Sequence, residues 1–217
     1  RVDTGWDIRS LLTDPDPETA ALSALADLEN GATSLLVTVG GRGTAPADLS
    51  RALEGVFVEM APVVISAAGT TTHLDAGRAL AEILAARGVQ ASPGSSLGAD
   101  PVGRALRVGA PADLTEINQI VSLAKSLGIR ALVADGTAAH EAGGGDAAEL
   151  GYSLAVGAEY LRALEARGVA IDDALGLLDF RFAATDDQFV TIAKFRAARG
   201  LLTRVAELSG APSAPPQ

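Results

Sequence analysis

The stretch Arg130-Ala-Leu-Val-Ala134 is a short apolar run that leads into the polar, glycine-rich segment Asp135-Gly-Thr-Ala-Ala-His-Glu-Ala-Gly-Gly-Gly-Asp146. A long amphipathic stretch then begins at Ala147. A buried strand, a polar loop and a helix in this order form one βα unit. In parallel α/β folds, the loop after such a strand is where binding and catalytic groups gather. The stretch therefore indicates both the fold class and the place to look for a site.

The same pattern recurs along the chain. Because Asp146 precedes the amphipathic stretch and Glu149 follows three residues later, we expect the two residues to form a capping box. About six βα steps are visible, whereas a closed barrel has eight. The sequence therefore predicts an α/β domain of the (β/α)8 TIM-barrel type, incomplete in residues 1–208, with an open doubly wound sheet as the alternative. The expected strands are 5–9, 34–39, 62–66, 90–92, 131–134 and 178–183, and the expected helices are 18–29, 47–58, 74–86, 114–127, 147–167 and 187–208.

The two ends of the chain differ from the rest. Residues 209–217 read Ser-Gly-Ala-Pro-Ser-Ala-Pro-Pro-Gln, a composition typical of a linker or a disordered tail. The chain starts at Arg1 rather than at a methionine, so we expect a fragment or a processed form.

Composition excludes several classes of protein. The formal net charge of −10 argues against a nucleic-acid partner, because a phosphate backbone requires a basic face. The chain has no cysteine, so disulfides and thiolate metal sites are excluded. No apolar run reaches the length of a membrane span, and we expect no membrane partner and a cytoplasmic location.

The motifs visible in the sequence are weak when taken alone. The glycines of 40–43 lack the spacing of a phosphate-binding loop and favour a simple turn. Those of 143–145 precede a helix and could bind an anion on backbone N–H groups, but the negative charges of Glu141 and Asp146 beside them favour a tight turn. His140 and Glu141 are a candidate acid–base pair, although adjacent residues usually point apart. A metal site needs three or more convergent ligands, and none is indicated.

Two longer patterns are more specific. The segment from Asp135 to Tyr160, together with Leu178-Asp-Phe-Arg-Phe-Ala-Ala and Phe189-Val-Thr-Ile-Ala-Lys-Phe-Arg-Ala-Ala-Arg199, resembles the adenosylcobalamin-dependent methylmalonyl-CoA mutases. The similarity is most specific over residues 131–208 and looser over residues 6–101. Within that family it is closest to the small (β) subunit of the bacterial heterodimeric enzyme.

The resemblance implies that this chain has lost catalytic groups. The family's catalytic chain carries a tyrosine and a histidine before Glu-Ala-Gly in this loop, and these positions fall on Thr137 and Ala138. A substrate-contacting glutamine of the catalytic chain falls on Gly98. Losing such groups typically costs 10²–10³-fold each in rate. The resemblance therefore implies no catalytic residue here, with Thr137, Ala138 and Gly98 as degenerate positions.

The resemblance also implies partners and a cofactor. The small subunit packs on a catalytic large subunit, which interconverts (R)-methylmalonyl-CoA and succinyl-CoA by a cobalamin-initiated radical rearrangement. Adenosylcobalamin is then bound by the partner, and none is expected on this chain. The family's C-terminal cobalamin-type domain is expected to be absent from this chain.

Two other functions stay open from the sequence. The chain could be an active acyl-CoA mutase that uses His140 and Glu141, or an acyl-CoA-binding or regulatory module without chemistry. Candidates for a docking surface are Tyr152, Tyr160 and the apolar side of the last helix, although we expect each to be buried in the core.

Overall fold

The computed structural model describes residues 7–211. The chain divides into two compact units, of which the first holds residues 1–99 and 119–131 and the second holds residues 100–118 and 132–217. Each unit is built on parallel strands.

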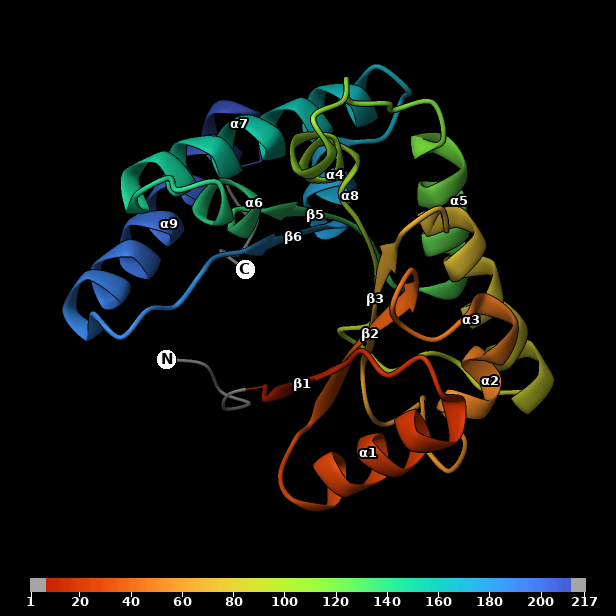
Figure 1. Cartoon of the computed structure of the whole chain (residues 1–217). Coiled ribbons are helices and arrows are strands. Elements are labelled where there is room, and N and C mark those ends of the chain that lie inside the picture. The colour runs from red at the N-terminus through yellow and green to blue at the C-terminus, as the bar shows by residue number, and fades with distance from the viewer. Residues whose placement is uncertain (1–6, 212–217) are drawn as a thin grey trace. The chain divides into compact units, whose positions relative to one another are not determined.

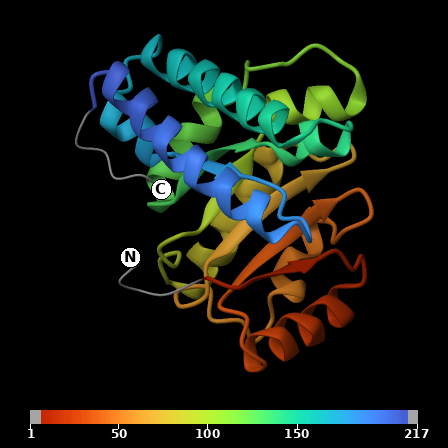
Figure 2. The same cartoon turned by 90° about the vertical axis from the view of Figure 1, so that its left-hand side faces the viewer.

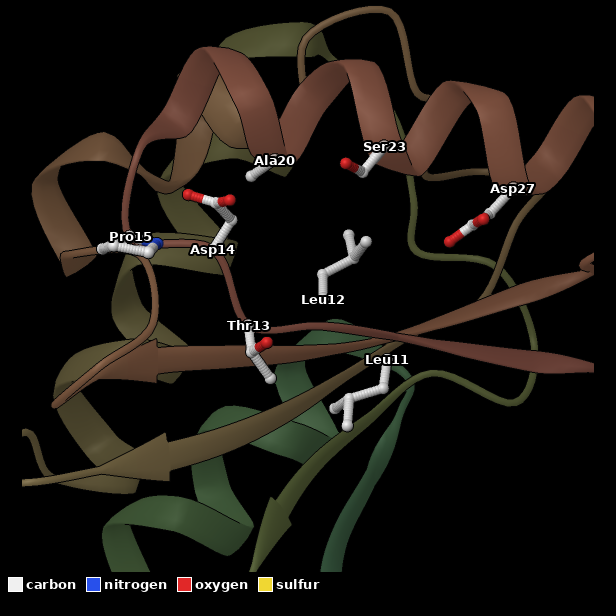
Figure 3. A pocket seen from close by; sticks show the side chains of 8 residues that line it. All are labelled: Leu11, Leu12, Thr13, Asp14, Pro15, Ala20, Ser23 and Asp27. Carbon is white, nitrogen blue, oxygen red and sulfur yellow. The ribbon is translucent and has the colours of Figure 1, made fainter.

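The first unit is a parallel sheet with helices on one side (Figure 1). Val37 of its second strand faces Leu12 on one neighbour and Ile65 on the other. All three side chains are buried, and Leu12 points toward α1 (Pro17–Glu29; Figure 3), so they lie on the face of the sheet that the helices cover. The elements are β1 (Arg9–Leu12), α1 (Pro17–Glu29), β2 (Ser34–Gly40), η1 (Pro46–Asp48), α2 (Leu49–Ala52), β3 (Val63–Ala68), α3 (His73–Arg87), β4 (Ser96–Ala99) and most of α5 (Ile117–Leu127).

The second unit packs helices around one strand pair. Its strands run parallel, with Leu132 opposite Leu178 and Asp135 opposite Arg181. Figure 2 shows the last helix lying along α7. The elements are α4 (Pro101–Val108), β5 (Arg130–Asp135), α6 (Thr137–Glu141), α7 (Asp146–Glu165), α8 (Ile171–Gly176), β6 (Leu178–Arg181) and α9 (Gln188–Leu208).

The strand order decides between the two predicted architectures. The first residue of β5, Arg130, belongs to the first unit, and its N–H donates to the carbonyl of Ser95 just before β4. Strand β5 then continues into the second unit. The strands of the sheet lie in chain order from β1 to β6. A doubly wound sheet reverses its order at a switch point. The predicted fold class, an incomplete α/β barrel-type domain, is therefore confirmed, with six strands in residues 7–211.

Local capping explains where several helices begin and end. The side chains of Asp16, Thr72 and Asp187 each accept the backbone N–H three positions later. This satisfies a donor that the first helical turn leaves unpaired. Gly88 and Gly128 follow helices in the left-handed region, with φ of 64° and 68°, as glycine does at helix ends.

The region after α3 differs from the prediction. The expected strand at 90–92 is wrong, and the fourth strand is Ser96–Ala99 inside the expected loop. Its four small or apolar residues are all buried but show no hydrophobic run, so the pattern was hidden. Helix α4 was also missed, although Asp100 before Pro101 is a typical helix start.

Three other elements also differ from their predicted bounds. The first strand is Arg9–Leu12 rather than 5–9, and residues 5 and 6 lie outside the described residues. The expected helix at 47–58 is a short 3-10 turn followed by Leu49–Ala52. The chain after β5 was expected to be loop as far as Asp146, but it forms the short helix α6.

The predicted capping box before α7 is wrong. The N-cap residue is Gly145, and no side chain caps this helix. Glu149 instead points into the interior, where its Oε1 accepts the N–H of Ala183 at 2.5 Å and its Oε2 accepts Lys194 Nζ at 2.6 Å. Asp146 lies 2.7 Å from the same ammonium. Two motifs distant in sequence are thus joined by one buried ion pair, because a buried charge requires a partner.

The last helix is exposed more widely than expected. Phe189, Ile192 and Leu201 are exposed, with Phe189 at 84%. The expectation that its apolar side lies in the core is wrong, since only Lys194, Ala198 and Ala206 of α9 are buried. The ion pairs of Lys194 with Asp146 and Glu149 join this helix to α7.

The predicted tail starts with the cap of this helix. Gly210 and Ala211 donate their N–H groups back to Glu207 and Ala206. Residues 212–217 lie outside the described residues, so the linker stays a prediction.

The buried ion pair leads to a stability prediction. Lys194→Met leaves the Glu149 carboxylate buried without a cation, and we expect a loss of about 3–5 kcal/mol in the free energy of unfolding. The control is Arg204→Met, which breaks the exposed pair with Glu207 and should cost less than about 1 kcal/mol. Urea denaturation measures both. Equal losses for the two variants would contradict a structural role for the buried pair.

The fourth strand leads to a second stability prediction. A Cβ on Gly98 would lie 2.2 Å from the carbonyl oxygen of Ile65, and φ is +57°. We expect Gly98→Ala to cost at least about 2 kcal/mol, because strain and overlap add. Gly128→Ala is the matched control, since φ is +68° with nothing within 4 Å of its Cβ, and it should cost about 1 kcal/mol. If Gly98→Ala loses no more stability than Gly128→Ala, the neighbouring strand moves to make room for the new methyl group, which would contradict this prediction.

Candidate functional site

The carboxyl ends of β5 and β6 bring an acid and a base together. Asp135 and Arg181 are the last residues of these strands and lie opposite each other in register. Arg181 Nη1 donates to Asp135 Oδ2 at 3.0 Å, and the Asp135 side chain is buried. Side chains at this end of parallel strands form the sites of barrel-type folds. We therefore take this ion pair as the centre of the candidate site.

A second guanidinium reaches the same carboxylate from α4. Arg107 Nη2 donates to Asp135 Oδ2 at 3.0 Å and to Thr137 Oγ1 at 3.1 Å. Its Nε donates to Glu141 Oε2 at 3.2 Å. One side chain thus ties α4 to the end of β5 and to α6.

Both guanidinium groups of this arrangement are paired with carboxylates. Arg107 and Arg181 face the carboxylates of Asp135 and Glu141. Burial alone would raise the pKa of Asp135, but Arg181, the Thr137 hydroxyl and Arg107 outweigh burial and hold this pKa below its ordinary value. Asp135 is therefore ionised at neutral pH, and it neutralises cations that could otherwise bind an external anion.

A second carboxyl lies at the start of α4. Asp100 accepts the N–H of Gly103 at 2.9 Å and the hydroxyl of Tyr160 at 2.5 Å, both on Oδ1. Its Oδ2 is buried without a hydrogen-bond partner and lies 4.0 Å from Arg107 Nη1. Burial raises the pKa of Asp100, and the nearby charge of Asp135 adds to this effect.

The two tyrosines of α7 face the same carboxyl but differ in their contacts. Tyr160 is fully buried, as expected, and hydrogen-bonds to Asp100. Tyr152 is partly exposed, yet its hydroxyl is buried without a hydrogen-bond partner. Burial and the neighbouring charge of Asp100 raise the pKa of Tyr152 to about 12. Both tyrosines therefore stay protonated at neutral pH.

The three positions that were expected to be degenerate lie in different surroundings. Thr137 donates its hydroxyl to Asp135 Oδ1 at 2.6 Å and accepts from Arg107, so it belongs to the charged network. Ala138 is buried, with 2% of its surface exposed. Gly98 is buried in β4, and backbone geometry leaves no room there for a side chain.

His140 and Glu141 are not brought together as an acid–base pair. Both lie in the last turn of α6, and the Glu141 carboxylate is bound by Arg107. His140 is half-buried.

Sequence reasoning missed most of this network. Arg107 and Asp100 belong to the helix that was not predicted, and nothing in the sequence alone places their partners. Asp135 and Arg181 could have been predicted, because each is a charged residue at the end of a predicted apolar strand.

Residues 7–211 offer neither a metal site nor a membrane span. Among these residues, no group of three or more histidine or carboxylate side chains is placed to hold a metal ion. No described helix is long and apolar enough to cross a membrane.

A cavity of about 330 Å³ lies between β1 and α1 in the first unit. Leu12 points toward α1, whereas Leu11 points away from it (Figure 3). The two carboxylates of its lining are engaged, since Asp14 accepts the N–H of Asp16 and Asp27 accepts the hydroxyl of Ser10. The cavity lies under the flank of a helix and offers no free charged group, so we assign it no chemistry.

The raised pKa of Asp100 gives a test with a defined sign. A carboxyl whose pKa is raised by folding stabilises the fold at low pH, and this contribution is lost as the pH rises through the folded pKa. Asp100→Asn keeps an oxygen that can accept from Tyr160 and Gly103 but removes the buried charge. We expect the variant to be at least as stable as the wild type at pH 7, with an advantage that shrinks toward pH 4, as measured by urea denaturation.

Asp135→Asn is the matched control with the opposite sign. The lowered pKa of Asp135 means that its contribution is present at neutral pH and is lost as the pH falls through the folded pKa. This variant should lose stability at pH 7. A loss at pH 7 for Asp100→Asn as well would contradict the account of the buried carboxyl.

Comparison with known proteins connects this geometry to a family. The family model for methylmalonyl-CoA mutase matches residues 111–215, which include the β5 and β6 ends of the site. A methylmalonyl-CoA mutase small subunit of Streptomyces virginiae is 44% identical over 216 residues, covering 97% of this chain and 34% of the relative.

Two further relatives agree. The small subunit of Propionibacterium freudenreichii subsp. shermanii is 38% identical over 94% of this chain and 32% of the relative. A methylmalonyl-CoA mutase of Cereibacter sphaeroides is 49% identical over 65 residues, which are 30% of this chain and 9% of the relative. The chain spans about a third of the length of the curated small subunits it matches. The similarity covers nearly the whole of this chain, and we conclude that it belongs to the methylmalonyl-CoA mutase family.

Proposed function

We propose that this chain is part of a non-catalytic small subunit, which supports the catalytic large subunit of a methylmalonyl-CoA mutase. The observation that carries the proposal is the pairing of Asp135 with Arg107 and Arg181. Charged groups that bind each other at the mouth of a barrel-type fold are not available to a substrate. Preorganised groups aimed at a reacting centre are what catalysis requires.

The small residues after β5 support the same proposal. Thr137 is used inside the network, and Ala138 has a methyl group where hydrogen-bond donation would be needed. Gly98 has no side chain and no room for one. None of these three positions offers a group that could steer a radical or hold a thioester carbonyl.

The same residues do not fit adenosylcobalamin. A corrin site needs groups that stack on the ring or reach its metal, whereas the charged groups at the end of β5 and the Thr137 hydroxyl are engaged with one another. We therefore place the cofactor, and the interconversion of (R)-methylmalonyl-CoA and succinyl-CoA, on the partner subunit. This chain contributes folded surface to the complex and no chemical step, in a cytoplasmic heterodimer without nucleic acid or membrane.

Co-expression with a methylmalonyl-CoA mutase large subunit tests the proposal. We expect the two chains to purify together, and we expect His140→Ala and Glu141→Ala to change the mutase turnover of the complex less than twofold. The matched control is Asp27→Ala, which removes a carboxylate of α1 in the first unit. A hundredfold loss with His140→Ala would contradict the proposal and support chemistry on this chain.

Two measurements on the chain alone separate the other functions. With added adenosylcobalamin and methylmalonyl-CoA, we expect no turnover, and any turnover would overturn the non-catalytic role. Calorimetric titration with methylmalonyl-CoA should give no saturable heat. Saturation at micromolar concentration would instead indicate an acyl-CoA-binding module.

A further inference from the structure

The segment formed by α4 and residues 109–116, here called the α4 segment, is weakly packed. Only Gly103 and Ala105 of α4 are buried, whereas Leu106 and Val108 are exposed. Residues 106–113 are exposed without interruption. Burial of apolar side chains is what usually holds a helix in place. Two small buried residues give this helix little of that stabilisation, so other contacts must hold it.

Polar contacts hold both ends of the helix. At its start, Tyr160 donates its hydroxyl to Asp100 and accepts the N–H of Val102 at 3.1 Å. We call this set the N-terminal latch. At its end, Arg107 binds Asp135, Thr137 and Glu141, and we call this set the C-terminal latch. Figure 1 shows α4 beside α6, which carries two of these partners.

The two latches differ in their response to solvent. The C-terminal latch is an ion-pair cluster, and the Arg107 side chain is 36% exposed, so salt can screen it. The N-terminal latch is buried, and its hydrogen bonds are made by a neutral tyrosine. Regions with few buried apolar contacts open locally without global unfolding.

We propose that the α4 segment is a lid, which the two latches hold against the carboxyl end of β5 and which opens without unfolding of α7. In the closed state Arg107 covers Asp135. In the open state the carboxyl end of β5, Asp100 and the hydroxyl of Tyr160 become accessible to solvent. The lid is a property of this chain's own packing and does not depend on the proposed function.

Hydrogen–deuterium exchange followed by mass spectrometry tests the lid on the full chain. In the wild type, the amides of residues 102–108 should exchange at least about tenfold faster than those of residues 153–161 in α7. Arg107→Ala should accelerate exchange in the α4 segment by about a further tenfold, because it removes charge-assisted hydrogen bonds. Tyr160→Phe should accelerate exchange at Val102 and Gly103.

The control variant is Arg162→Ala, which breaks an exposed ion pair with Glu159 on α7. It should leave exchange in the α4 segment unchanged. If Arg107→Ala accelerates α7 and the α4 segment equally, or if residues 102–108 exchange no faster than α7, the helix opens only with the whole unit and the lid is refuted.

A salt series on the wild type keeps the test independent of variants that fail to fold. Between 0.05 M and 1 M NaCl, exchange should accelerate in residues 102–108 and stay constant in residues 153–161. An absence of any salt effect on the α4 segment would contradict an ionic latch.

Discussion

One buried carboxylate organises the second unit of this protein. Asp135 ends β5 and accepts guanidinium groups from two directions, Arg181 on the neighbouring strand and Arg107 on α4. A buried carboxylate is costly unless it is paired and hydrogen-bonded. Its partners therefore fix the end of β6, the first turn of α6 and the last turn of α4 at the same time.

The pairing keeps the guanidinium groups of Arg107 and Arg181 bound to carboxylates of this chain. Arg107 and Arg181 are paired with the carboxylates of Asp135 and Glu141 at the place where a barrel-type enzyme would hold its substrate. This internal network holds the end of β5 in place, and the Thr137 hydroxyl is one of its members.

Much of the fold could be predicted from the sequence. Strands such as 34–39 and 131–134 are continuous apolar runs, and helices such as α3 and α9 have clear capping residues, so periodicity located them closely. The fourth strand could not be found, because Ser96, Gly98 and Ala99 are buried for steric reasons that a hydrophobicity pattern does not reveal. The failed capping box at Asp146 has a similar cause, since Glu149 is recruited by Lys194, 45 residues away.

The sequence predicts where the candidate site lies but not which residues form it. The end of β5 follows from the βα pattern, whereas the degeneracy of Thr137, Ala138 and Gly98 rests on the family resemblance and stays a prediction. The long-range pairs that join α4 to β5 depend on tertiary packing that no local pattern encodes.

The most direct test of the account is an NMR titration of the Asp135 side-chain carboxyl carbon. The account predicts a pKa below the ordinary value of 3.8 in the folded protein; a pKa at or above that value would contradict it, since an acid gripped by two guanidinium groups cannot be so easily protonated.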